Sequence, residues 1–338
     1  MRRLQCLDGL RGVLAAYVLV SHMAGFAALP AWATQPFSHG EAAVDTFFIL
    51  SGMVILRSLE SFHCRSVPFI AARAARTLPA FLAVFAVALV LQPLPTALPS
   101  MPWIGPESPA RAIWSEGWPA TWRIEIAAHL TMTHGIFPDG ALPHVWVSFL
   151  GAAWSLSTEW QFYALAALLV RLPGTGQATL ERTAWLLLAV SITAILWAHV
   201  APAGWHFSRA FLPNKAQYFA LGIASAGLTR ALSRSGLRRF GLVLAATLAL
   251  CVAQGGAAKL GAPLLWTACL AAQLWPRTRA LGLLARGLQA PLLLRLGSVS
   301  YSLYLVNEPV QNSWRRRWRH SPGATRLSSR RFGCRALR

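Results

Sequence analysis

Long apolar runs, separated by short polar segments, follow one another along almost the whole chain. Each is near the about 20 residues that an α-helix needs to cross about 30 Å of hydrocarbon. They lie at Leu10–Leu29, Val44–Leu59, Leu78–Leu98, Trp154–Leu172, Ala184–Ala201, Ala216–Leu232, Phe240–Gly256, Leu260–Trp275 and Leu292–Trp314. The pattern therefore predicts an all-α polytopic membrane protein with about nine transmembrane helices.

Arginines between these runs predict the orientation. Clusters occur at residues 2–3, 57–76, 171–182, 230–239 and 277–295, whereas the intervening segments are poor in basic residues. Basic loops stay in the cytoplasm, so we expect a cytoplasmic N-terminus and an outward-facing segment 99–153. Residues 124–137 are apolar over only about 14 positions, which favours an interfacial or re-entrant piece.

Composition agrees with a membrane location. The chain has 338 residues, of which 55% are hydrophobic and only 12% charged, whereas soluble domains carry about 25% charged residues. The net charge of +20 is explained by the basic loops and by the C-terminal tail, so we expect no nucleic-acid partner. The five cysteines have no metal-ligand or disulfide-framework spacing, and no metal is expected.

The C-terminal tail departs from the charge pattern. Residues 315–338 contain nine arginines and no apolar run. After nine spans from a cytoplasmic start this segment would lie outside, against the positive-inside rule. We expect a membrane domain at residues 1–314, and a tail at 315–338 that is disordered or a replaced terminus in place of a tenth helix.

Three polar residues, Asp8, Arg11 and His22, lie in or just ahead of the first run, in the segment "LDGLRGVLAAYVLVSH". Each ionisable group at a bilayer centre costs roughly 2.5–3.5 kcal/mol, so such residues are functional candidates. Arg11 and His22 are about three turns apart and lie within about 20° of one line, with His22 about 16 Å beyond Arg11. His22 is a candidate for proton transfer or nucleophilic attack. Asp8, just ahead of the run, suits a helix N-cap.

The second and third runs carry further candidates. In "VDTFFILSG", Asp45 either orients an imidazole, as the carboxylate of a triad does, or neutralises Arg11. Ser51 is a polar candidate of the same helix, and with its neighbouring glycine it also suits close helix packing. Arg73 and Arg76 share a helical face and offer forked donors suited to phosphate, although basic anchors also occur at such positions.

Two later segments are also unusually polar for membrane helices. In "WSLSTEWQFY", Ser155, Glu159 and Tyr163 are successive turns apart and line one stripe. In "YSLYLVNEP", Tyr301 and Asn307 stand within a predicted span, together with a second tyrosine and a glutamate. Lipid tolerates none of these side chains well, which makes them candidates for a substrate site or a buried polar contact.

Taken in order, these five motifs resemble acyltransferase family 3, the bacterial integral-membrane O-acyltransferases that modify polysaccharides, lipopolysaccharide and related glycosides. The resemblance implies a ten-helix bundle in the bacterial inner membrane, in contact with membrane lipid. It implies that cytoplasmic acyl-coenzyme A, usually acetyl-coenzyme A, donates an acyl group to a hydroxyl of a glycan or glycolipid acceptor at the outer face.

Carried over by motif, the resemblance makes His22 the catalytic histidine, Arg11 its essential partner, and Arg73 and Arg76 the contacts for coenzyme A phosphates. Whether His22 is acylated or acts as a base stays open. Asn307 stands where the family often has histidine, and it cannot titrate. Two other classes fit part of the pattern: a proton-coupled transporter of a glycan or small molecule, and an inactive family member with a damaged C-terminus.

Overall fold

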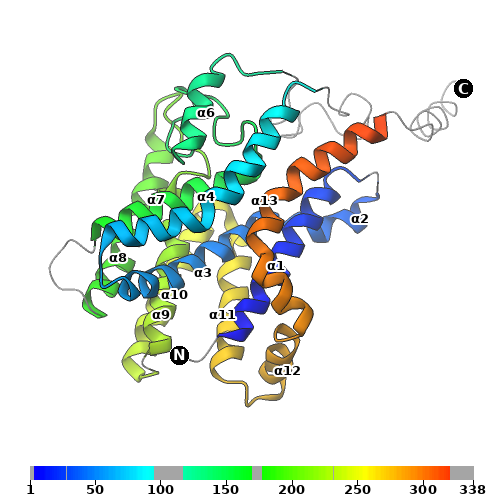
Figure 1. The fold of residues 1–338 in the computed structure, drawn as a ribbon. Coiled ribbons are helices and arrows are strands. Elements are labelled where there is room, and N and C mark those ends of the chain that lie inside the picture. Colours follow the sequence, from blue (N-terminus) through cyan, green and yellow to red (C-terminus); the bar gives the residue numbers. More distant parts are fainter. Residues whose placement is uncertain (1–3, 28, 95–116, 170–176, 231, 320–338) are drawn as a thin grey trace, which may run out of the picture.

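The computed structural model describes residues 4–27, 29–94, 117–169, 177–230 and 232–319. It is 78% helical and contains no strand within these ranges, where an isolated bridge between Pro138 and Phe207 is the one β-type pairing. The helices form a bundle, with α6 at one end and α12 near the N-terminus at the other (Figure 1). The predicted all-α class is confirmed.

Each of the nine predicted apolar runs corresponds to one long helix. These are α1 (Gln5–Ala24), α3 (Gly40–Ser61), α4 (Ser66–Leu91), α7 (Trp154–Leu169), α8 (Gln177–Val200), α9 (Ala216–Arg230), α10 (Arg234–Gly255), α11 (Gly261–Leu274) and α13 (Pro291–Arg319). Shorter elements connect them: α2 (Ala31–Thr34), η1 (Gln35–Phe37), α6 (Trp122–Leu130), η3 (Gly151–Ala153), η4 (Leu212–Asn214), η5 (Gly256–Leu260) and α12 (Arg279–Leu288).

Helix α4 is longer at its start than the apolar run predicted at Leu78–Leu98. It begins at Ser66, so Arg73 and Arg76 lie inside it, three residues apart as expected for a shared helical face. The segment "AARAAR" ahead of Pro79 consists of strong helix formers, which continue the helix although the arginines end the apolar run. As a result, both arginines are held on a regular helix.

The predicted number of about nine membrane spans is not confirmed. Within the described ranges, five stretches are long and apolar enough to cross a membrane: Gln5–Ala24, Ala31–Ser61, Ser66–Leu91, Arg182–Val200 and Arg234–Leu274. Helices α7, α9 and α11 have only 16, 15 and 14 residues, which at about 1.5 Å per residue is short of about 30 Å. Helix α6 has nine residues, so the segment at 124–137 does not span as a helix.

Glycines bring two pairs of helices into close contact. A Cβ atom added to Gly12 of α1 would lie 2.3 Å from the carbonyl oxygen of Leu293 in α13. One added to Gly222 of α9 would lie 2.0 Å from the carbonyl oxygen of Ile49 in α3. Small residues at helix crossings allow such backbone contact in membrane proteins. Gly12 of the "LDGLRG" motif therefore packs α1 on α13, and Gly222 packs α9 on α3, where Gly52 of the "LSG" motif also lies close to the carbonyl oxygen of Phe219.

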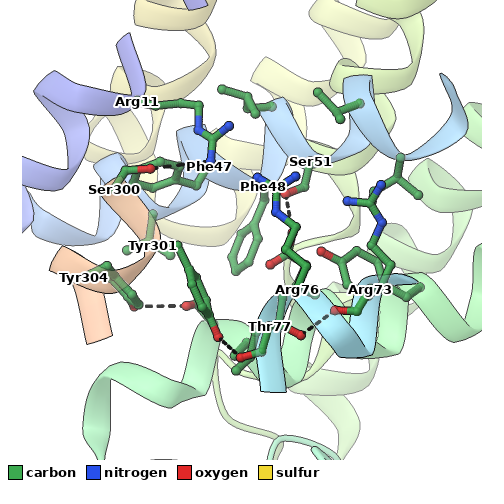
Figure 2. A pocket seen from close by; sticks show the side chains of 18 of the residues that line it. Arg11, Phe47, Phe48, Ser51, Arg73, Arg76, Thr77, Ser300, Tyr301 and Tyr304 are labelled. Carbon is green, nitrogen blue, oxygen red and sulfur yellow. Dashed lines mark hydrogen bonds between the residues drawn. The ribbon is translucent and has the colours of Figure 1, made fainter. Parts of the chain in front are cut away.

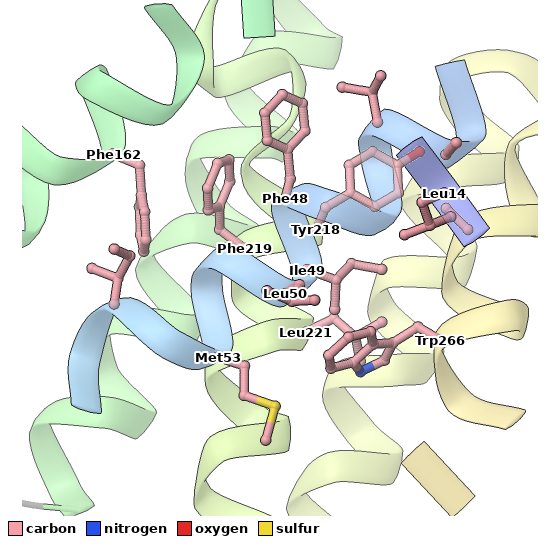
Figure 3. Packing of buried hydrophobic residues seen from close by; sticks show 14 of the residues in the cluster. Leu14, Phe48, Ile49, Leu50, Met53, Phe162, Tyr218, Phe219, Leu221 and Trp266 are labelled. Carbon is pink, nitrogen blue, oxygen red and sulfur yellow. The ribbon is translucent and has the colours of Figure 1, made fainter. Parts of the chain in front are cut away.

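An aromatic core joins α3, α7, α9 and α11 (Figure 3). The ring centroids of Phe162 and Phe219 are 4.3 Å apart, and those of Phe48 and Phe219 are 5.1 Å apart. In the same core the indole of Trp266 donates to Ser225 Oγ at 2.9 Å. Large rings with a satisfied polar group pack as a rigid unit. This unit packs against α3, and Phe48 of the same unit also lines a cavity on this helix.

Candidate functional site

A cavity of about 140 Å³ lies between α1, α3, α4, α7 and α13 (Figure 2). Its polar lining consists of Arg11, Ser51, Arg73, Arg76, Thr77, Ser155, Glu159, Tyr163, Ser300, Tyr301 and Tyr304. Eight of the predicted site residues are in this set, from segments far apart in the sequence. Three others, His22, Asp45 and Asn307, do not line it.

The arginines give the cavity a positive charge. Arg11, Arg73 and Arg76 line it against one carboxylate, that of Glu159. Arg11 donates to Ser300 Oγ at 3.5 Å, and Arg73 donates to Ser58 Oγ. The Nε atoms of Arg11 and Arg73 are buried without a hydrogen-bond partner among the described residues. Buried unpaired donors are costly, so the site is suited to an anion with several oxygens.

Ser155, Glu159 and Tyr163 all line the cavity, as expected for one stripe of α7. Ser51 of α3 donates to Glu159 Oε1 at 2.7 Å. The Arg73 guanidinium lies over the Tyr163 ring, 5.9 Å from its centroid. Ser51 therefore contacts Glu159 across the helices, whereas its neighbour Gly52 packs against Phe219 of α9.

His22 lies beyond the cavity and contacts Asn307 of α13. The distance between His22 Nδ1 and Asn307 Oδ1 is 2.9 Å. Asn307 Nδ2 donates to the carbonyl oxygen of Tyr304 at 2.7 Å, which fixes the amide with its oxygen toward the imidazole. Because that oxygen only accepts, the contact favours the neutral tautomer with the proton on Nδ1, which leaves the lone pair on Nε2. His22 is thus oriented to use Nε2 as a base or nucleophile.

Neither of the two partners predicted for Asp45 is its partner in the structure. Asp45 is buried and pairs with Lys215 Nζ at 2.7 Å, not with His22 or Arg11. Asp45 is not part of the cavity lining, and it lies about 120° around α3 from the cavity-lining Ser51, six residues later. The group that contacts the imidazole is instead Asn307.

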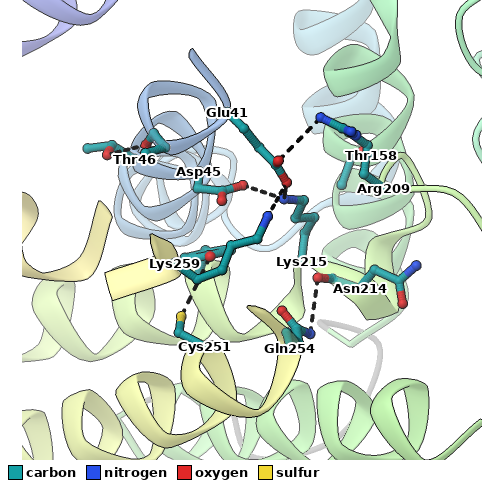
Figure 4. A network of polar contacts seen from close by, with 12 residues as sticks. Glu41, Asp45, Thr46, Thr158, Arg209, Asn214, Lys215, Cys251, Gln254 and Lys259 are labelled. Atoms are coloured by element: carbon teal, nitrogen blue, oxygen red, sulfur yellow. Dashed lines mark hydrogen bonds and ion pairs between the residues drawn. The ribbon is translucent and has the colours of Figure 1, made fainter. Parts of the chain in front are cut away.

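Lys215 is the centre of a wider charged network (Figure 4). Besides Asp45 it binds Glu41 Oε1 at 2.7 Å, and Glu41 also pairs with Lys259 at 2.6 Å and with Arg209 at 3.2 Å. The exposed fractions of the Lys215 and Asp45 side chains are 4% and 1%. Buried charges persist only when paired, so this network fastens α3 to η4, η5 and α9.

Two hydrogen bonds tie α13 to the start of α7. Ser155 Oγ donates to Tyr304 Oη at 3.0 Å. The backbone N–H of Ala152 donates to Glu308 Oε2 at 2.7 Å. A carboxylate there also complements the positive end of the helix that follows. Tyr301 instead donates to the carbonyl oxygen of Thr77 in α4, at 2.7 Å.

A buried pair of histidines packs beside the same start of α7. The rings of His129 and His134 are stacked with centroids 4.1 Å apart, and His134 Nε2 is 3.1 Å from the carbonyl oxygen of Ala153. Both lie outside the five spanning stretches. Burial lowers the pKa of His134 to about 4 and, together with the charge of its neighbour, lowers that of His129 well below its usual range. Both rings are neutral at pH 7.

Two polar residues of the cavity, Thr77 and Ser300, were not among the candidates from the sequence, whereas Tyr304 was predicted there only as a second tyrosine of the last span. For Ser300 the signal was present, because Ser300, Tyr304 and Asn307 follow one another at helical spacings of four and three. Phe47 and Phe48, which also line the cavity, had no such signal because aromatic residues are common in apolar helices.

The chain matches a known protein family. The model of a protein family described as "acyltransferase domain" matches residues 4–329, nearly the whole chain. No curated protein and no solved structure matches the chain.

Proposed function

Since the chain belongs to acyltransferase family 3, a family of membrane acyltransferases, we propose that it transfers an acyl group from acyl-coenzyme A to a hydroxyl of a glycan or glycolipid. The observation that carries the donor assignment is the positive cavity with its unpaired arginine donors. The proposal places the arginine side toward the cytoplasm and His22 toward the outer face of a bacterial inner membrane, in agreement with the arginine-rich loops.

The arginines would bind the phosphates of coenzyme A. Phosphate oxygens accept forked hydrogen bonds from guanidinium groups. They would supply partners for the buried Nε atoms of Arg11 and Arg73, which lack them among the described residues. Arg76 is exposed at the cavity and would meet the donor first. The thioester would then point along α1 toward His22, about 16 Å from Arg11.

His22 would do the chemistry through Nε2. As the acceptor oxygen attacks the thioester carbon, its proton moves to Nε2, a C–O bond forms, and the C–S bond breaks. The proton then passes from Nε2 to the departing coenzyme A thiolate. An acyl-histidine route uses the same atom in two steps. In both routes Asn307 keeps the proton on Nδ1, which is 2.9 Å from its oxygen.

Labelled acetyl-coenzyme A supplied to membranes tests the proposal. We expect label on glycan or glycolipid with the wild-type protein, and loss of at least 100-fold with His22→Ala, because a positioned base contributes about 10²–10⁴-fold. His199→Ala is the matched control, since His199 is exposed near the end of α8 and its Nδ1 contacts the carbonyl oxygen of Ile195 in the same helix. Movement of unlabelled glycan across the membrane without label transfer would instead indicate a transporter.

A further inference from the structure

Helix α12 has the position of an interfacial helix. It follows the spanning stretch Arg234–Leu274 directly after residues 275–278, and it lies at the end of the bundle that carries the N-terminus (Figure 1). With ten residues it is too short to cross the hydrocarbon core. Trp275, at the junction, is exposed, and tryptophan collects at the level of the lipid headgroups. These features locate α12 at the membrane surface.

The helix has two chemically different faces. Its inward face consists of apolar residues that pack on the bundle: Leu281, Ala285 and Leu288. Its outward face carries Arg279, Leu283 and Arg286, which are all exposed. At about 100° per residue, these three side chains lie within about 60° of one another. An exposed leucine between two arginines combines apolar and cationic contacts, as helices that lie on membranes do.

The outward face receives no counter-charge from the neighbouring chain segments. Residues 256–307 contain five basic residues and no aspartate or glutamate. Within the part of the chain that the structure describes, neither Arg279 nor Arg286 takes part in an ion pair. The two guanidinium groups are therefore available to an external anion, and a partner that also has an apolar part would contact Leu283.

The end of α12 packs directly on the first turns of α1. Gln289 Nε2 donates to Cys6 Sγ at 3.2 Å. A Cβ atom added to Gly9 would lie 1.6 Å from the carbonyl oxygen of Leu288, so the two backbones touch there. Arg11, which lines the cavity, follows Gly9 by two residues. The placement of α12 therefore affects the part of α1 that carries Arg11.

We propose that the outward face of α12 binds the headgroups of anionic phospholipids through Arg279 and Arg286, and that this contact holds α12 against α1. Guanidinium groups bind phosphate oxygens through paired hydrogen bonds. The lipid supplies the negative charge that residues 256–307 lack, and its apolar region receives Leu283. Since this surface is separate from the cavity, the inference does not depend on the acyl-transfer reaction.

Photoactivatable phosphatidylglycerol and phosphatidylcholine test the binding on the full-length protein in nanodiscs. We expect phosphatidylglycerol to crosslink to α12 at least tenfold more than phosphatidylcholine, because each arginine near an anionic lipid surface strengthens binding about fivefold. The double variant Arg279→Gln and Arg286→Gln should lose this preference at α12, and the double lysine variant should keep most of it. Crosslinking at the start of α10, where Arg234 and Arg238 are exposed, is the reference within each sample and should not change. Equal crosslinking of the two lipids at α12 would overturn the inference.

Melting temperatures in nanodiscs of phosphatidylcholine, with or without phosphatidylglycerol, test the effect on packing. We expect phosphatidylglycerol to raise the melting temperature of the wild type and to raise that of the double glutamine variant less. Arg123→Gln is the control, since Arg123 is exposed on α6 at the other end of the bundle, and it should show the wild-type gain. A full gain in the double variant would overturn the inference. So would an equal gain from soluble glycerol phosphate, which would indicate a site for free phosphate. Neither measurement requires acyl transfer, so a failure here leaves the proposed function standing.

Discussion

The contact between His22 and Asn307 shows how a neutral residue can orient an imidazole. A carboxylate would accept from Nδ1 and add a negative charge, whereas an amide oxygen accepts without one. The Tyr304 carbonyl holds the amide in the required orientation. The sequence suggested His22 by its helical alignment with Arg11, but it could not show which of the polar residues on other helices faces the ring.

Removing the Asn307 amide tests this orientation. We expect Asn307→Leu to lower kcat at least tenfold, because Nδ1 loses its acceptor and the ring can adopt the wrong tautomer or orientation. Asn307→Asp keeps an acceptor oxygen and is expected to retain more activity. Initial rates at saturating acetyl-coenzyme A measure kcat. Wild-type kcat in a stably folded Asn307→Leu protein would contradict the assignment.

At the scale of the helix, the sequence predicted the elements better than their packing. The lengths and positions of the apolar runs located the nine helices that correspond to them. The start of α4 at Ser66 was missed because charged residues ended the apolar run. The glycine beside Ser51 indicated that a helix packs closely there, but it did not indicate which helix is the partner. Which helix meets Gly12 or Gly222 depends on long-range contacts that no local pattern encodes.

Two glycines of α9 give a matched test of this packing. A Cβ at Gly222 would lie 2.0 Å from the carbonyl oxygen of Ile49, whereas one at Gly227 meets nothing within 4 Å. We expect Gly222→Ala to lower the melting temperature, since overpacking costs about 1–3 kcal/mol. Gly227→Ala is expected to be neutral or stabilising by up to about 1 kcal/mol, because alanine favours helix. Equal melting temperatures for the two variants would show that α3 and α9 are not in contact here.

Across the whole molecule, buried charges and stacked rings connect segments that are far apart in the sequence. Lys215 follows α8 and precedes α9, yet it binds Asp45 and Glu41 at the start of α3. The expectation that Asp45 serves His22 or Arg11 relied on the motif order alone. A local pattern gives the residue type and the helical face, but the partner of a buried charge is set by how the helices assemble.

Neutralising the Asp45–Lys215 pair one residue at a time tests this assembly. Removing one partner of a buried pair costs about 3–5 kcal/mol, whereas removing both is often nearly neutral. We therefore expect Asp45→Asn and Lys215→Met each to lower the thermal stability of the detergent-solubilised protein strongly, and the double variant to recover part of the loss. A double variant as unstable as the sum of the two single variants would show that the residues do not interact.

The stacked histidines at the α6 end make stability depend on pH. Their pKa values are lower in the folded protein than the usual 6.5, with His134 at about 4. Below pH 6.5 the unfolded chain therefore binds protons that the folded protein does not, so stability falls as the pH drops toward 4. At 1.36 kcal/mol per unit, His134 alone accounts for a loss on the order of 3 kcal/mol. Above pH 6.5 the pair contributes no pH dependence.

Melting temperatures between pH 7.5 and 4.5 measure this effect. The double substitution His129→Phe and His134→Phe keeps aromatic rings beside Phe85, which already stacks on His129 with centroids 5.2 Å apart, but it removes both titrating groups. We expect its stability to decline less steeply below pH 6.5 than that of the wild type, whereas the exposed-site control His199→Phe should follow the wild type. Parallel curves for the wild type and the double variant would mean that the pair takes up protons while folded, as exposed imidazoles do. His134 contacts the backbone just ahead of α7, in the segment that is joined to α13 through Glu308 and Ser155. In the case of parallel curves, protonation of the pair at low pH would not destabilise this segment.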